Sequence, residues 1–350
     1  MQLLLALGCS DYMINDMAED PVLLDDTAVD DEAEPLDGDT DQPVGPGSVS
    51  GRICDPSGDG WVAGARVWIE VDTDNDGETA LLETTTDADG RFLLEGLPTG
   101  TWEIHVEKGS FSTTFVVEIT GGLVELPLDE CLDPGGLDIA VMQGSYDATE
   151  EILDALGLQY DLIPQGAQLD LLRDEARLMD YDLLFFNCGM NEDWLYSDTE
   201  TVTTNLVGFV NAGHSLYASD WSFLAVESAF PQAIDFYGDD AFLFEAYGGD
   251  DGTLTGDVLD PTMQAVLGSA SAKIHYDLAG WAMTVGAESG TEVLVTGSPT
   301  TLWEEQPLQD VPLAVRFEAG AGRVVFTTFH NEPQITADME LMLREIILSL

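Results

Sequence analysis

The chain has 350 residues, 67 of them acidic and only ten of them lysine or arginine, so its formal net charge is −57 at pH 7. A hydrophobic fraction of 45% is ordinary for a globular protein; it excludes a wholly disordered chain and leaves room for two folded domains. Because this charge repels phosphate backbones and anionic membrane surfaces, we expect cations as partners and no nucleic acid.

The first nine residues, 1–9, form a short apolar stretch that ends in Gly8 and Cys9. This ending resembles the signal of a bacterial lipoprotein, in which the cysteine is diacylated and becomes the mature N-terminus. The stretch departs from that pattern because it carries no preceding lysine or arginine and is shorter than the roughly 7–15 residues of a normal apolar core. The alternative is a buried N-terminal segment with a free thiol. We expect a signal remnant, lipidation at Cys9, and a place in the cell envelope, at the outer membrane or cell surface.

Residues 10–48 form an acidic segment that contains four prolines and no lysine or arginine. Such a composition provides little apolar surface to bury, and its like charges repel one another. We therefore predict a disordered tether that holds the folded domains away from the membrane.

Short runs rich in β-forming residues come next, separated by glycine- and aspartate-containing turns about ten residues apart. This spacing predicts an all-β sandwich over residues 49–128. The expected strands are Ser48–Ile53, Arg66–Val71, Thr79–Thr85, Phe92–Glu95, Thr101–Val106, Ser112–Ile119 and Val124–Leu126.

Several phrases in this region occur in a familiar order: Gly51-Arg52-Ile53, Gly64-Ala65-Arg66-Val67, Thr86-Asp87-Ala88-Asp89-Gly90-Arg91-Phe92 and Gly96-Leu97-Pro98-Thr99-Gly100-Thr101-Trp102. Together they resemble a carboxypeptidase regulatory-like domain, which has a transthyretin-like fold. The resemblance implies a noncatalytic accessory module.

One loop of this region has the spacing of a calcium-binding loop. Asp72, Asp74, Asp76 and Gly77 are followed by Glu83, as in the Asp-x-Asp-x-Asp-Gly-x5-Glu pattern of an EF-hand. Carboxylates at alternate positions can converge on a hard cation. The flanking residues have strand character, however, so a solvated acidic turn is the alternative. Calcium is thus the cofactor that this loop suggests.

Two cysteines lie at the ends of the predicted sandwich. Cys54 follows its first strand, and Cys131 lies in the predicted linker, residues 129–136, after its last strand. An oxidising compartment would allow a disulfide between them, but the sequence leaves open whether the two side chains meet.

From residue 137 to residue 350 the pattern changes to alternating strands and helices with short connections. This alternation predicts an α/β domain with a parallel sheet covered on both faces. The expected strands are Leu137–Met142, Tyr160–Ile163, Tyr181–Asn187, Ser215–Ser219, Lys273–Leu278, Glu292–Thr296, Leu313–Glu318 and Arg323–Thr328, and the expected helices are Ala148–Leu156, Leu169–Met179, Thr199–Val210, Phe223–Ala229 and Thr336–Leu350.

The order of these elements resembles the flavodoxin-like fold of class I glutamine amidotransferases. Three phrases carry the resemblance: Tyr181–Gly189, Gly213–Trp221 and Phe329-His330-Asn331-Glu332. The last is similar to the element that places the catalytic histidine of this family, which implies that role for His330 and an orienting role for Glu332.

The nucleophile of such an enzyme lies on a sharp strand-to-helix turn with small residues on either side. Ala218 and Ser222 fit this requirement around Asp220, so an aspartate occupies the place of the cysteine. A carboxylate is a weaker nucleophile than an activated thiolate. If the turn is placed one residue earlier, Ser219 becomes the candidate nucleophile, but bulky aromatic residues then flank it. Cys188 is another candidate nucleophile, but it follows a different strand.

Three interpretations of this site remain. In the first, Asp220, His330 and Glu332 line a cleft that binds a ligand or partner without catalysis. In the second, the same three side chains bind a divalent metal. In the third, Ser219 or Cys188 works with His330 and Glu332 in hydrolysis or acyl transfer. We expect the first interpretation to hold, and therefore no amidotransferase activity.

Overall fold

The computed structural model describes residues 46–72, 79–127, 129–238, 246–303, 307–331 and 335–350. Within it, Pro43–Leu350 forms one compact unit. The predicted lipidation site Cys9 and the predicted tether up to residue 45 lie outside the described residues. So do Asp74, Asp76 and Glu332. Among the described residues, the helices are all too short or too polar to span a bilayer.

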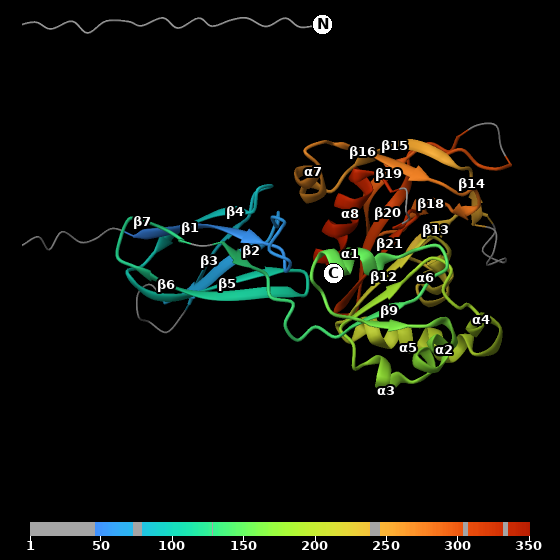
Figure 1. The fold of residues 1–350 in the computed structure, drawn as a ribbon, viewed down its shortest axis with the longest axis horizontal. Coiled ribbons are helices and arrows are strands. Elements are labelled where there is room, and N and C mark those ends of the chain that lie inside the picture. The colour runs from blue at the N-terminus through green and yellow to red at the C-terminus, as the bar shows by residue number, and fades with distance from the viewer. Residues whose placement is uncertain (1–45, 73–78, 128, 239–245, 304–306, 332–334) are drawn as a thin grey trace, which may run out of the picture. The chain divides into compact units, whose positions relative to one another are not determined.

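The N-terminal region is all-β, as the sequence predicts, and its strands form two sheets (Figure 1). One sheet has the order β4 (Arg91–Leu97), β1 (Gly47–Cys54), β7 (Leu123–Glu125), with β8 (Glu130–Cys131) also paired to β1. The other has the order β3 (Ala80–Thr85), β2 (Arg66–Val71), β5 (Gly100–Lys108), β6 (Phe111–Ile119).

Alternation of buried and exposed side chains places one face of each strand in the sandwich core. In β6, for example, Phe111, Phe115, Val117 and Ile119 are buried while the residues between them are exposed or half-buried. The turn into β4 depends on Gly90, which has φ of +73° and would bring an added Cβ within 2.5 Å of the Ile53 carbonyl oxygen. A glycine is therefore required at this position.

The sandwich extends beyond residue 128, into the segment that the sequence predicts as a linker. Glu130–Cys131 forms β8 beside β1, and this pairing brings Cys131 opposite Cys54. The two cysteines form a disulfide. Asp133 then makes a further β-bridge to Ser112. The segment predicted as a linker is therefore partly paired with strands of the sandwich.

The α/β region contains a nine-stranded sheet, and its first part is parallel. The strand order there is β10 (Asp161–Ile163), β9 (Ile139–Met142), β11 (Leu183–Phe186), β12 (Ser215–Ser219), β21 (Gly322–Thr327). Renumbered along the chain, this is the order 2-1-3-4-5 of flavodoxin-like folds. The central strands β9 and β11 are fully buried, continuous apolar runs, as expected for a parallel sheet covered on both faces.

The second part of the sheet corrects the prediction of a wholly parallel arrangement. Beyond β21 the order continues with β20 (Val311–Ala319), β19 (Thr291–Gly297), β15 (Gly252–Val258) and β16 (Ser271–Tyr276), each antiparallel to its neighbour. The connection from β20 to β21 is only two residues long, and a hairpin of that length joins only antiparallel strands.

Helices cover both faces of the parallel strands, and the two faces have separate cores. Side chains of α1 (Thr149–Ala155) and α8 (Ala337–Leu348) pack with one set of alternate strand residues, including Val141 and Phe185. Those of α2 (Gln165–Arg173), α3 (Glu175–Leu178), α5 (Thr199–Asn211) and α6 (Phe223–Ala229) pack with the other set, including Met142 and Phe186. Figure 1 shows α1 and α8 on the opposite side of the sheet from α2, α3 and α5.

The prediction of a single helix over Leu169–Met179 is wrong. The structure has α2 and α3 separated by Asp174, whose backbone is non-helical and whose side chain accepts a hydrogen bond from the N–H of Arg177. Aspartate is a favoured residue at a helix start, and this capping bond favours a break over one continuous helix.

The region around residues 230–300 contains elements that the sequence does not predict. They are β13 (Ile234–Phe236), β14 (Tyr247–Gly249), β15 (Gly252–Val258), α7 (Pro261–Leu267), β17 (Trp281–Ala282) and β18 (Thr284–Ala287). All of these strands except β15 are too short for a recognisable alternation. A signal for α7 does exist, because Asp260 caps the helix and Pro261 occupies its first turn.

Candidate functional site

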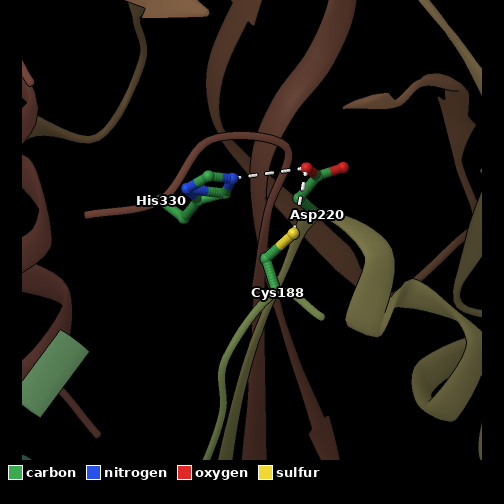
Figure 2. Close-up of side chains that lie close together, drawn as sticks. All are labelled: Cys188, Asp220 and His330. Atoms are coloured by element: carbon green, nitrogen blue, oxygen red, sulfur yellow. Dashed lines mark hydrogen bonds and ion pairs between the residues drawn. The ribbon is translucent and has the colours of Figure 1, made fainter. Parts of the chain in front are cut away.

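Three side chains meet at the carboxyl ends of the central parallel strands, where ligands bind in open α/β sheets. Cys188 follows β11, Asp220 follows β12, and His330 follows β21. Figure 2 shows that one oxygen of Asp220 faces both neighbours. Asp220 Oδ2 lies 3.3 Å from Cys188 Sγ and 3.4 Å from His330 Nε2. The residues of three separate chain segments thus form one cluster.

Asp220 lies at the tip of a strand-to-helix turn. Strand β12 ends at Ser219, a 3-10 turn (Asp220–Ser222) comes next, and α6 begins at Phe223. Asp220 has φ of +43°, a left-handed conformation that non-glycine residues seldom adopt. Small, buried Ala218 and Ser222 leave room for the turn. This local geometry is that of a nucleophile elbow, and it carries a carboxylate.

The Asp220 carboxylate is enclosed by protein. Its Oδ1 accepts a hydrogen bond from the N–H of Ala282 at 2.6 Å, and its Oδ2 faces Cys188 and His330. Burial raises the pKa of Asp220 to about 6, although His330, the Ala282 N–H and Cys188 each favour the charged form. The hydrogen bonds fix the carboxylate in one orientation.

Cys188 is held at both of its backbone polar groups. Its N–H donates to Ser219 Oγ, and its carbonyl oxygen accepts from the N–H groups of Ser145 and Tyr146. Burial and the neighbouring Asp220 carboxylate raise the pKa of the thiol well above its usual value. Cys188 is therefore a thiol at neutral pH, and a thiol is a weak nucleophile.

Ser219 has a structural partner of its own. Its hydroxyl donates to Asp147 Oδ2 at 2.6 Å, and the side chain is fully buried. Asp147 Oδ1 also accepts from the N–H of Asn331, so this carboxylate links the end of β12 to the segment that carries His330. Asp147 does not cap α1, because the N-cap residue of that helix is Ala148 and no side chain caps it.

The cluster lines a cavity of about 240 Å³. Aromatic side chains form much of its wall: Tyr276 and Trp281 stack with ring centroids 3.8 Å apart, and Tyr146 meets Trp221 edge to face. Trp221 Nε1 donates to the carbonyl of Gly280, which ties the turn at Asp220 to the loop between β16 and β17. The lining of the cavity therefore combines the polar side chains of the cluster with aromatic rings.

Sequence reasoning missed the wall formed by Tyr276, Leu278 and Trp281. These residues come from β16, the loop after it and β17, and the position of these elements beside the elbow is a long-range property of the fold. It also missed Glu192, where burial and then the nearby charge of Asp220 raise the pKa of the carboxyl to about 7. No local motif marks any of these positions.

The predicted calcium loop is described only in part. Asp72 directly follows β2, whereas Asp74 and Asp76 lie outside the described residues. Glu83 belongs to β3 and forms an ion pair with Arg66, Oε2 to Nε 2.8 Å. Calcium binding at this loop stays a prediction.

Comparison with a family model supports the N-terminal part of the fold. The family model of the carboxypeptidase regulatory-like domain matches residues 48–125, which confirms that resemblance. A search of curated proteins found no match.

Similar solved structures include a glutamine amidotransferase from Thermotoga maritima, with 9% identity and a TM-score of 0.36 over 55% of this chain and 75% of that one. A putative GMP synthase protein from Thermoplasma acidophilum has 10% identity and a TM-score of 0.40, covering 61% and 94%. A putative ThuA-like protein from Parabacteroides merdae has 13% identity and a TM-score of 0.40, covering 61% and 88%. Glutamine amidotransferase and ThuA-like folds are thus among the structures similar to this chain, and these likenesses do not bear on its activity.

Proposed function

We propose that this chain is an exported cell-envelope protein whose amidotransferase-like domain binds a small ligand without catalysing acyl transfer. The observation that carries the proposal is Asp220, a carboxylate at the tip of the elbow that faces His330 across 3.4 Å. Acyl transfer from an amide would need a thiol or hydroxyl at this tip, because a carboxylate is a much weaker nucleophile toward amides. The adjoining cavity of about 240 Å³ gives a small ligand a place to bind.

The alternative nucleophiles are poorly suited to the reaction. Ser219 is fully buried, is absent from the cavity lining and donates its proton to Asp147. Cys188 does line the cavity, and its Sγ lies within 4.8 Å of the His330 ring nitrogen. That position favours a second candidate function, a hydrolase or acyl-transfer enzyme in which Cys188 attacks with help from His330 and Glu332. The raised pKa of the thiol opposes it.

Labelling with reactive probes separates the two functions. The protein carries Cys9→Ser and is kept folded in the presence of EDTA. Under these conditions we expect iodoacetamide to leave Cys188 unmodified and a fluorophosphonate to leave Ser219 unmodified. The disulfide removes Cys54 and Cys131 from the reaction. Iodoacetamide should modify Cys188 only after unfolding, since the side chain is 1% exposed. Peptide mass spectrometry measures the modified fraction at each position.

The matched control for this experiment is Asp220→Cys, which puts a thiol at the tip of the elbow. We expect this variant to be alkylated at position 220 in the folded protein, because His330 lies close enough to take the proton of the new thiol, and more slowly once His330→Ala is added. The proposal fails if the parent protein is labelled stoichiometrically at Cys188 or Ser219 and His330→Ala abolishes that labelling.

Two features support the export and envelope part of the proposal. The ending at Cys9 resembles a lipoprotein signal, and a lipid on this cysteine would anchor the protein in a membrane. The disulfide between Cys54 and Cys131 is a bond that persists in oxidising compartments. We expect mass spectrometry of the protein from its native host to show a diacylated N-terminal Cys9. An N-terminal peptide that continues unmodified through Cys9 would contradict the lipid anchor.

A further inference from the structure

We infer that Cys188, Asp220 and His330 form a site for one divalent transition-metal ion of the zinc class. The inference builds on the proposed binding function, because it assigns a ligand to the same cavity. The sequence alone suggested Asp220, His330 and Glu332 as metal ligands; the structure instead puts the Cys188 thiol beside the first two.

The separations between the donor atoms fit a single ion. In tetrahedral zinc sites the Zn–S distance is about 2.3 Å and the Zn–N and Zn–O distances are about 2.1 Å, so two donors are about 3.4–3.6 Å apart. Here Sγ and Nε2 lie 3.3 Å and 3.4 Å from Asp220 Oδ2, and all three donors lie within 4.8 Å of one another. One ion can reach all three with small side-chain movements.

The charges of the cluster also balance. Cys188 and His330 both approach the same carboxylate oxygen, Asp220 Oδ2, so one cation can take the place of two donor hydrogens. On binding, Cys188 loses its proton to solvent, and His330 binds as a neutral imidazole that carries its ring proton on Nδ1, so that Nε2 coordinates the ion. The thiolate and the carboxylate then neutralise the two positive charges of the ion. This balance matters because all three residues are buried, and an unpaired buried charge is costly.

Hydrogen bonds from neighbouring groups hold two of the ligands in place. Ala282 fixes the second oxygen of Asp220, and Ser219 with the loop after β9 fixes the backbone of Cys188. Such supporting contacts orient ligands in metal sites. The three donors come from the protein while the cavity adjoins them, which leaves a coordination position for a small molecule. A thiolate and an imidazole favour zinc-class ions over calcium or magnesium.

Cobalt(II) tests the site, because a thiolate bound to it gives a charge-transfer absorption that carboxylates cannot give. The experiment uses the full chain with Cys9→Ser. The protein is treated with EDTA to remove bound metal and is then dialysed into excess calcium, which occupies other carboxylate sites. It is then titrated with cobalt. We expect one equivalent to bind with tetrahedral visible bands and the thiolate absorption. Cys188→Ser should remove that absorption, and His330→Gln or Asp220→Asn should weaken cobalt binding at least ~100-fold.

The matched control is His275→Gln, a histidine on β16 outside the cluster, which should bind cobalt like the parent. Circular dichroism shows whether each variant is folded. If Asp220→Asn does not fold, the results for Cys188→Ser and for His330→Gln decide the test. Cobalt bound without a thiolate band, or a band that survives Cys188→Ser, overturns the inference. The labelling of Cys188 and Ser219 is done in EDTA, so its result does not depend on a bound metal. Failure of the metal-site inference therefore does not affect the test of catalysis.

Discussion

Replacing Lys108 by methionine should lower the free energy of unfolding by about 3–5 kcal/mol at neutral pH. Lys108 forms an ion pair with Glu345 of α8, and both side chains are less than a tenth exposed. Its ammonium also donates to the carbonyl of Ala63. Without the lysine, Glu345 would remain buried with its charge uncompensated. Urea unfolding followed by tryptophan fluorescence measures the change.

The loss should depend on pH in a defined direction. Burial raises the pKa of Glu345 above its usual value of 4.5, and Lys108 is the principal group that opposes the rise. Removing Lys108 therefore raises this folded-state pKa further above the unfolded value. The penalty develops as the pH rises above about 4.5, where the unfolded carboxyl ionises first. We expect the deficit of the variant relative to the parent to be smaller at pH 5 than at pH 8.

Two further variants show whether the buried pair is responsible. Lys273 is exposed, so Lys273→Met should change stability by less than about 0.5 kcal/mol. Lys108→Met combined with Glu345→Leu should recover most of the lost stability, because an apolar pair of similar size leaves no buried charge. A deficit that is equal at pH 5 and pH 8, or that the double variant keeps in full, would contradict this account.

Much of the fold is predictable because its signals are local. The strands Ser215–Ser219 and Arg323–Thr328 are predicted from runs of β-forming residues, and the structure has strands at both places. A residue that comes directly after a strand in the sequence also lies near the end of that strand in space. His330 and Asp220 could therefore be expected at the same edge of the sheet, although they are far apart in sequence.

The rest of the site depends on contacts that no local pattern specifies. Cys188 resembles an ordinary buried cysteine in the sequence, and only the parallel pairing of β11 with β12 puts it beside Asp220. Trp281 belongs to a strand of two residues, too short to be recognised from alternation. Its place in the cavity wall depends on the antiparallel half of the sheet.

The second large effect should come from loss of the disulfide between Cys54 and Cys131. The bond joins residues 77 positions apart, and closing a loop of that length lowers the entropy of the unfolded chain enough to contribute about 4 kcal/mol. We expect Cys54→Ala with Cys131→Ala to lower the unfolding free energy of the sandwich by about that amount. Differential scanning calorimetry of the full chain measures it.

Reduction of the parent protein is the matched control, because it breaks the same bond without removing either side chain. Parent and double variant should unfold at nearly the same temperature in a reducing agent and at different temperatures without it. Cys188 should be unaffected by mild reduction, since it is a free thiol. Pairing of β8 with β1 holds Cys131 opposite Cys54, and the effect of the covalent bond adds to that pairing. If reduction leaves the melting of the parent unchanged, the backbone pairing alone closes the sandwich and the entropic argument fails.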